Sequence, residues 1–367
     1  MVLTRCQPIT GSYHPEDCRF LLKPIAVADI PVAEKERLIQ SGQRHYSEML
    51  THEQPLTPDY RTLFQEQTRR YRTRLAQDIL NLAGHIRRTR AAPITLVSLA
   101  RAGTPIGALL RRALARLGVT VEHYSISIIR DRGIDQQALC YLLHDLARPT
   151  GGVVFVDGWT AKGVITAELR RAIDDWNDHH GTSLSAALYV IADPAGVADV
   201  SASADDYLIP SGILGACVSG LVSRSILNER IEPGDFHGCV LYPELADEDL
   251  SNWFLDEVSE AMQCLQPRPL TLVDDGQRRE LRGRAYLMDL RQRFGIVDIN
   301  HIKPGVLEAT RAMLRRVPGL LLLRDPDHPD VAHLRLLAAD KGVAIRVEPT
   351  MPFLAVALIR VLSADSL

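Results

Sequence analysis

The stretch VVFVDGWTAKGVITAEL, residues 153–169, indicates the fold most clearly. It opens with an apolar run at 153–157 that ends in Asp157, and from residue 164 its apolar side chains recur every three or four positions. The first pattern is typical of a buried strand and the second of an amphipathic helix. The stretch therefore predicts a strand, a short loop and a helix in succession.

The loop of this unit carries small and polar residues, namely Gly158, Thr160, Ala161, Lys162 and Gly163. A loop of this kind before a helix can direct backbone N–H groups and the helix N-terminus at one point, where they bind phosphate. Asp157 beside it could hold ribose hydroxyls, directly or through Mg²⁺, which prefers oxygen ligands. The alternative is an ordinary strand-to-helix turn capped by the threonine.

Similar units occur on either side in the sequence. An apolar run at 94–100 leads through the loop RAGTP into a helical pattern, a second strand is expected over 119–129, and a further strand begins at 187. Strands that alternate with helices at this spacing indicate a doubly wound, mainly parallel α/β sheet. Ligands of such sheets bind at the carboxyl ends of the strands, so the polar loops are expected to meet at one edge.

The pattern divides the chain into two domains. Residues 1–264 hold the sheet together with an N-terminal extension, in which 61–88 reads as a long helix. Residues 265–284 are rich in proline and charge and are expected to be a linker. A smaller α/β pattern follows over 285–367.

Composition limits the function. The 367 residues include 42 basic and 45 acidic side chains, which excludes a strongly basic nucleic-acid coat protein. The six cysteines form no CxxC pair, so neither a zinc cluster nor a dithiol motif is expected. No apolar stretch approaches the roughly 20 residues that a bilayer requires. We expect a reduced, cytoplasmic protein without membrane contacts.

Three segments resemble the phosphoribosyltransferase family. Residues 153–163 are similar to its signature of four apolar residues, two acids, an apolar residue, any residue and Thr-Gly-Gly-Thr, although this chain has one acid and reads Thr-Ala-Lys-Gly. SLARAGTPIG, residues 98–107, resembles the pyrophosphate loop. YSISIIRDRGID, residues 124–135, resembles the mobile catalytic loop.

The resemblance implies a sheet of phosphoribosyltransferase type and an enzyme that uses phosphoribosyl pyrophosphate and Mg²⁺. A base-like acceptor would displace pyrophosphate, with the arginines stabilising the leaving group. The implied catalytic residues are Arg130, Arg132 and Asp157, with Asp157 also holding the metal. The implied diphosphate contacts are Arg101, Ala102 and Gly103, and the implied acceptor contacts are Ser219, Ser223 and Arg224. The alternative is a nucleotide-sensing RNA-binding regulator that performs no chemistry.

Nearly the whole chain resembles phosphoribosyltransferase-like proteins of bacterial tellurite-resistance and stress-response operons, some of which are labelled StiP-type cysteine proteases. The resemblance is carried by stretches such as EKERLIQSGQRHYSEML and DFHGCVLYPELADEDLSNWF. It implies a homo-oligomer with operon partners: a second phosphoribosyltransferase-like protein, an ATP-grasp ligase and a phosphatase.

A cysteine protease needs a histidine near the thiol. Cys140 precedes His144 by four residues, and Cys239 follows His237 by two. Because buried cysteines are more often small apolar core residues, the sequence favours sugar-phosphate chemistry over proteolysis.

Residues 303–360 resemble the Pelota-type RNA-binding domain. Kink-turn binders related to it carry an Asn-Glu pair at the entry to the first helix, where this chain has Leu307-Glu308. Lys303, Glu308 and Arg311 are the expected RNA contacts. From residue 285 onward 11 basic side chains face 9 acidic ones, so we expect weak binding of structured RNA.

Overall fold

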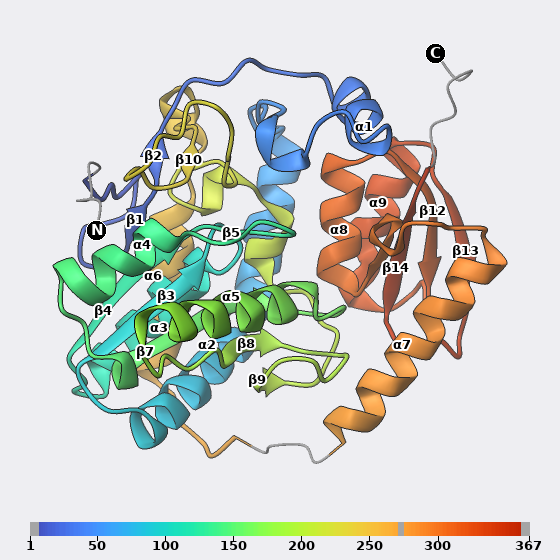
Figure 1. Ribbon diagram of the computed structural model, residues 1–367. Helices are drawn as coiled ribbons and strands as arrows, with labels where there is room; N and C mark the ends of the chain where they lie inside the picture. Colours follow the sequence, from blue (N-terminus) through green and yellow to red (C-terminus); the bar gives the residue numbers. More distant parts are fainter. Residues whose placement is uncertain (1–6, 271–274, 361–367) are drawn as a thin grey trace.

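The centre of the protein is a six-stranded parallel sheet (Figure 1), seen in a computed structural model that describes residues 7–270 and 275–360. Every neighbouring pair of strands in it runs parallel. The strands in spatial order are β1 (Arg19–Leu21), β4 (Val121–Ile126), β3 (Ile94–Leu99), β7 (Val153–Trp159), β8 (Leu188–Ala192) and β9 (Val200–Ser203). The expected mixed α/β sheet is confirmed.

The central strands are apolar on both faces because helices cover both. In β3, Ile94 and Leu96 enter one buried cluster while Val97 and Leu99 enter the other. Such continuous apolar runs are typical of parallel sheets. One face is covered by α2 (Pro58–Thr89), α3 (Thr104–Arg116) and α6 (Ser251–Gln263), and the other by α4 (Gln136–Cys140) and α5 (Val164–His180). Helix α2 confirms the helix expected over 61–88.

Two of the central strands differ from their expected limits. Strand β7 continues through Gly158 and Trp159, because Trp159 still pairs with Ala192 of β8. The strand expected over 119–129 ends at Ile126, after which β5 (Ile128–Ile129) turns back onto β6 (Gly133–Ile134). The loop that was expected to be a mobile catalytic loop is therefore a short antiparallel hairpin.

The C-terminal part has its own four-stranded sheet, in the order β11-β14-β12-β13. Its elements are α7 (Gly276–Arg293), β11 (Ile302–Pro304), α8 (Val306–Arg315), β12 (Pro318–Leu323), α9 (Ala332–Asp340), β13 (Ala344–Val347) and β14 (Ala355–Ile359). Residues 276–284, expected to be linker, form the first turns of α7.

The remaining segments join the two parts at their edges. Helix α1 (Val32–Gln40) supplies Glu36, which accepts a hydrogen bond from Arg316 at 2.6 Å. Strand β2 (Lys23–Pro24) pairs with β10 (Gly238–Cys239). Of the helices in the described ranges, none is both long enough and apolar enough to cross a membrane.

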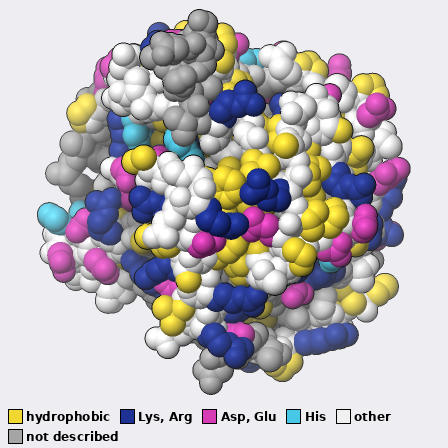
Figure 2. All heavy atoms as spheres, turned by 90° about the vertical axis from the view of Figure 1, so that its right-hand side faces the viewer, with side chains coloured by type: hydrophobic (Ala, Val, Ile, Leu, Met, Phe, Trp, Pro, Cys, Tyr) yellow, Lys and Arg dark blue, Asp and Glu magenta, His cyan; other side chains and the backbone are white. Residues whose placement is uncertain are grey.

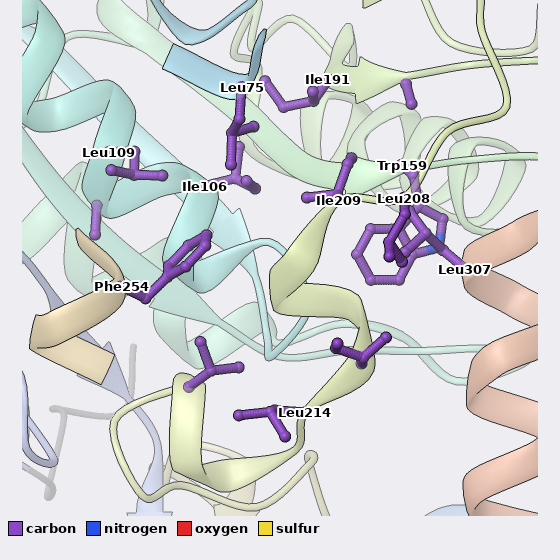
Figure 3. Packing of buried hydrophobic residues seen from close by; sticks show 14 of the residues in the cluster. Leu75, Ile106, Leu109, Trp159, Ile191, Leu208, Ile209, Leu214, Phe254 and Leu307 are labelled. Carbon is purple, nitrogen blue, oxygen red and sulfur yellow. The ribbon is translucent and has the colours of Figure 1, made fainter. Parts of the chain in front are cut away.

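The two parts share one hydrophobic core. Leu307 of α8 is 3% exposed and belongs to the same cluster as Trp159 and Leu208 of the first domain. Figure 3 shows its side chain reaching toward those two residues. A Cβ on Gly212 would lie 2.3 Å from the Leu307 side chain, so a larger residue at position 212 would displace that side chain. The C-terminal part therefore packs on the first domain through apolar side chains.

Replacing Leu307 with alanine tests this shared core. Because a buried leucine is removed at the junction, we expect L307A to lower the free energy of unfolding by ~2–5 kcal/mol. Urea unfolding measures it. The control is L336A, since Leu336 of α9 is 62% exposed and its loss should cost less than ~0.5 kcal/mol. Equal effects of the two variants would contradict a shared core.

Candidate functional site

The carboxyl ends of β3 and β7 are neighbours at the centre of the sheet. From β3 the chain proceeds outward to β4 on one side, whereas β7 lies on its other side. This reversal of strand order opens the crevice in which α/β proteins bind ligands. Gly103, just after β3, allows the close approach of the two loops, because a Cβ there would lie 2.7 Å from the carbonyl oxygen of Val156.

Arg101, in the loop after β3, is held by the first domain itself. Its buried guanidinium donates to the carbonyl oxygen of Val222 at 3.0 Å and pairs with Glu53. The other oxygen of Glu53 accepts from the backbone N–H of Ala216 at 2.6 Å. Burial alone would raise the pKa of Glu53, but Arg101 and Arg315 outweigh it and lower that pKa to about 2. Glu53 is therefore a fixed negative charge in the crevice.

The loop expected to bind phosphate is engaged within the protein. The N–H of Gly158 donates to the carboxylate of Asp157 at 2.7 Å, and the N–H of Thr160 donates to Ala192 at 3.1 Å. Ala161 is buried where a Cβ on Gly305 would meet it at 3.7 Å. Lys162 donates to the carbonyl oxygen of Ile302 at 3.1 Å. The turn into α8 thus covers this loop. Gly163, directly before α5, has a left-handed φ of 73°.

Asp157 lies in a setting that disfavours its charge. Burial raises the pKa of this carboxyl to about 7, although the Gly158 N–H and Arg311 act in the opposite direction. Glu308 raises it further. No group of three His, Cys, Asp or Glu side chains that could hold a metal ion occurs within residues 7–270 and 275–360. The structure gives Asp157 no companion ligands for the expected Mg²⁺.

The expected catalytic arginines both lie in the turn between β5 and β6, but their side chains contact different partners. Arg130 pairs with Asp131 at 3.0 Å and lies 5.1 Å from the ring of Tyr46, which Arg224 approaches from 5.5 Å. Arg132 instead pairs with Glu48. Tyr46 thus brings Arg130 and Arg224 to one side chain and leaves Arg132 outside.

The expected acceptor serines are buried in the packing of the first domain. The hydroxyl of Ser223 accepts from the N–H of Val240 at 2.8 Å and donates to the carbonyl oxygen of Arg224 at 2.7 Å. Ser219 is 3% exposed. Of the three expected acceptor residues, Arg224 is near enough to Arg101 and Glu53 for their charges to act on its pKa, which burial lowers to about 10.

Helix α8 directs a line of charged side chains at the crevice. Glu308, Arg311 and Arg315 follow at spacings of three and four, which places them on one face of the helix. Trp159 donates to Glu308 at 3.2 Å, and Arg311 lies 5.0 Å from the Trp159 ring. The expected RNA contacts Glu308 and Arg311, with Lys303 of β11, therefore lie at the contact between the domains. The sequence reasoning missed Arg315, which this spacing could have indicated, and Glu53, for which no local signal exists.

Neither expected cysteine–histidine pair is joined by a hydrogen bond in the described part of the chain. Cys140 is half-buried, and burial together with Asp145 raises its thiol pKa. His144 lies in the π-helical turn Tyr141–Asp145, with its ring 5.9 Å from that of His180. Cys239 is fully buried with a pKa of about 12, and the ring of His237 contacts the hydroxyl of Ser127 at 2.7 Å.

The other described cysteines offer no better arrangement. Burial raises the pKa of Cys217 to about 12, and Cys18 is fully buried. Cys264 is exposed at the end of α6. Cys6 lies outside the described residues.

Comparison with known proteins decides the family. The family described as tellurite-like stress resistance cysteine protease StiP matches residues 11–259. A protein of Acinetobacter baylyi named Cysteine protease StiP is 40% identical in an alignment that covers 96% of this chain and 95% of the relative. This chain belongs to the StiP family. The Pelota RNA-binding domain matches residues 281–361 of this family member, so the C-terminal domain is Pelota-like.

Solved structures add little to this StiP assignment. A hypoxanthine phosphoribosyltransferase of Trypanosoma cruzi is 17% identical, with 37% of this chain and 76% of that chain covered and a TM-score of 0.25. A variant of the same enzyme with the product IMP is 19% identical, with coverage of 50% and 85% and a TM-score of 0.25. Likeness at this level carries no argument.

The family finding corrects the functional expectation. The relative that covers the whole chain is named a cysteine protease, which contradicts a phosphoribosyltransferase that uses phosphoribosyl pyrophosphate and Mg²⁺. The phosphoribosyltransferase prediction rested on an acidic residue and several small residues that follow a parallel strand. In this chain the loop with these residues contacts the C-terminal domain. The expectation of a tellurite-resistance and stress-response family is confirmed.

Replacing Asp157 with asparagine tests the charge balance of the crevice. A carboxyl whose pKa is raised in the folded state loses stability as the pH rises from its unfolded pKa to its folded pKa, here from about 4 to about 7. At pH 5 only part of this stability has been lost, so D157N should exceed the wild type in melting temperature by a smaller margin than at pH 8. At pH 8 it should melt higher by at least ~2 °C. Thermal unfolding at both pH values measures this, and a lower melting temperature at pH 8 would contradict it.

Proposed function

We propose that this protein is a cysteine peptidase that serves in resistance to tellurite-like stress. The observation that carries the proposal is the 40% identity, over nearly the whole of both chains, to a relative named Cysteine protease StiP. The match of the StiP family to residues 11–259 supports a catalytic centre in the domain that holds the parallel sheet.

Cys140 is the nucleophile that we propose. A peptidase thiol must be reachable by substrate and lie near a base. Cys140 is half-buried, whereas Cys18, Cys217 and Cys239 are buried. His144 follows it by four residues, in the π-helical turn Tyr141–Asp145 that continues α4.

The proposed reaction follows from this pair. His144 accepts the proton of the Cys140 thiol as its sulfur attacks the peptide carbonyl carbon, and the C–N bond breaks as the amine leaves with that proton. Water then hydrolyses the thioester, which restores the thiol and releases the carboxylate. Because burial raises the pKa of Cys140, proton removal by a base is needed near neutral pH.

Two further expectations remain proposals for the same chain. The sheet order supports a scaffold of phosphoribosyltransferase type without that activity. The Pelota match supports RNA binding by the C-terminal domain. Lys303, Glu308 and Arg311 face the first domain. The RNA contacts would therefore come from the side of the C-terminal domain that faces away from the first domain. Figure 2 views the molecule from the side where β13 lies, and Lys and Arg side chains are scattered there among apolar ones.

The peptidase proposal predicts that C140S abolishes hydrolysis of a fluorogenic protein substrate. H144Q should lower kcat at least ~100-fold, because general-base catalysis contributes about that much. The matched control is C264S, which removes an exposed thiol with no proposed role and should keep full activity.

Two outcomes would count against the proposal. Full activity of folded C140S would exclude Cys140 as the nucleophile. Full activity after every thiol has been alkylated, checked by mass spectrometry, would exclude a cysteine peptidase altogether.

A further inference from the structure

Strand β13 forms an open edge of the C-terminal sheet. In the sheet order β11-β14-β12-β13, its one strand neighbour among the described residues is β12. All four residues of β13 are exposed. Figure 1 places the strand on the side of this domain that faces away from the six-stranded sheet. An edge strand presents N–H and C=O groups to which another strand can bind.

The backbone groups that face outward belong to Ile345 and Val347. The N–H of Glu348, directly after the strand, donates to the carbonyl oxygen of Leu323 in β12 at 2.9 Å. Successive residues of a strand direct their N–H and C=O groups to opposite sides. The backbone of Arg346 therefore faces β12 like that of Glu348, whereas the backbones of Ile345 and Val347 face away from it. A further strand would form its hydrogen bonds to these two residues.

The side chains of β13 do little to prevent pairing. Native edge strands are usually protected by charged residues, prolines or bulges. Ile345 and Val347 are instead apolar and β-branched, and they are 41% and 47% exposed. The charged residue of the strand, Arg346, lies with its guanidinium 5.5 Å from the ring of Phe294, beside the end of α7. A partner strand would therefore cover apolar side chains that otherwise face water.

The sequence of this segment is complementary to itself. Antiparallel pairing of two copies centred on Ile345 places apolar side chains opposite one another, Ile345 against Ile345 and Val343 against Val347. Arg346 then lies opposite the small side chain of Ala344. The register centred on Arg346 would place two arginines opposite each other, which destabilises a strand pair.

The charges at the ends of the strand also match in this register. Gly342 comes to lie opposite Glu348 of the second copy, so the adjacent Lys341 comes near an opposite charge. Lys341 is exposed. Because the pairing is symmetric, this contact occurs at both ends of the paired strands. A second copy of this chain is therefore the partner that the edge fits.

We propose that two copies of this chain form a dimer in which β13 pairs antiparallel with β13 of the second copy, about a twofold axis at Ile345. The two C-terminal sheets then form one continuous sheet, and neither copy keeps β13 as an open edge. A twofold axis is the commonest symmetry of soluble oligomers, and it uses the same surface of both subunits.

Sedimentation velocity of the full chain over a range of concentrations tests the proposal. We expect the mass to rise from the 40.7 kDa of one chain to twice that value, with a dimer Kd below ~10 μM. I345K should raise this Kd at least tenfold, because two lysines would lie opposite each other. The matched control is L281K, which places the same charge at an apolar residue of α7 that is 65% exposed. It should leave the Kd unchanged.

A mixture of two variants tests the register and shows that the monomeric variants are folded. I345E, like I345K, should be monomeric alone. An equimolar mixture of the two should form the mixed dimer, because lysine then lies opposite glutamate. Absence of a dimer in the mixture or an unchanged Kd of I345K would overturn the proposal. A wild-type protein that is monomeric at every concentration would also overturn it, and would leave the edge to a different protein. None of these readouts requires peptidase activity, so the dimer can fail independently of the proposed function.

Discussion

The packing of Leu307 against Trp159 is the contact on which the rest of the molecule depends. It brings α8 across the carboxyl edge of the sheet, next to the loops that follow β3 and β7. Once α8 lies there, the turn before it covers Ala161, and the charged face of the helix closes the crevice. A hydrophobic contact thus determines where a set of charged side chains meets.

Local patterns predicted the elements and not their contacts. Strands β3 and β7 and helix α2 were foreseeable, because an apolar run or a helical repeat is written in consecutive residues. The extension of β7 to Trp159 depends on pairing with β8, which the residues around Trp159 alone do not reveal. Lys303, Glu308 and Arg311 were expected to contact RNA, whereas Glu308 and Arg311 contact Trp159 of the first domain.

The candidate site shows the same division. Arg101 and Asp157 do lie at neighbouring strand ends, as parallel topology requires. What the sequence could not show is that Glu53, more than forty positions upstream, neutralises Arg101, and that the loop N–H groups are already bonded. The proposed thiol lies elsewhere: in Figure 1, α4 is on the far side of the sheet from α8. The proposed peptidase centre and the crevice that α8 closes are therefore separate places on one chain.

The shared core also has a consequence for how the protein is made. Because translation begins at the N-terminus, the sheet domain emerges from the ribosome while α8 is still being synthesised. Until residue 307 leaves the exit tunnel, Trp159 and Leu208 lack the side chain that buries them, and the crevice stands open. The last fifth of the chain therefore completes the hydrophobic core of the first domain as well as that of the C-terminal domain. A nascent chain stalled before that point would present an apolar patch suited to capture by chaperones.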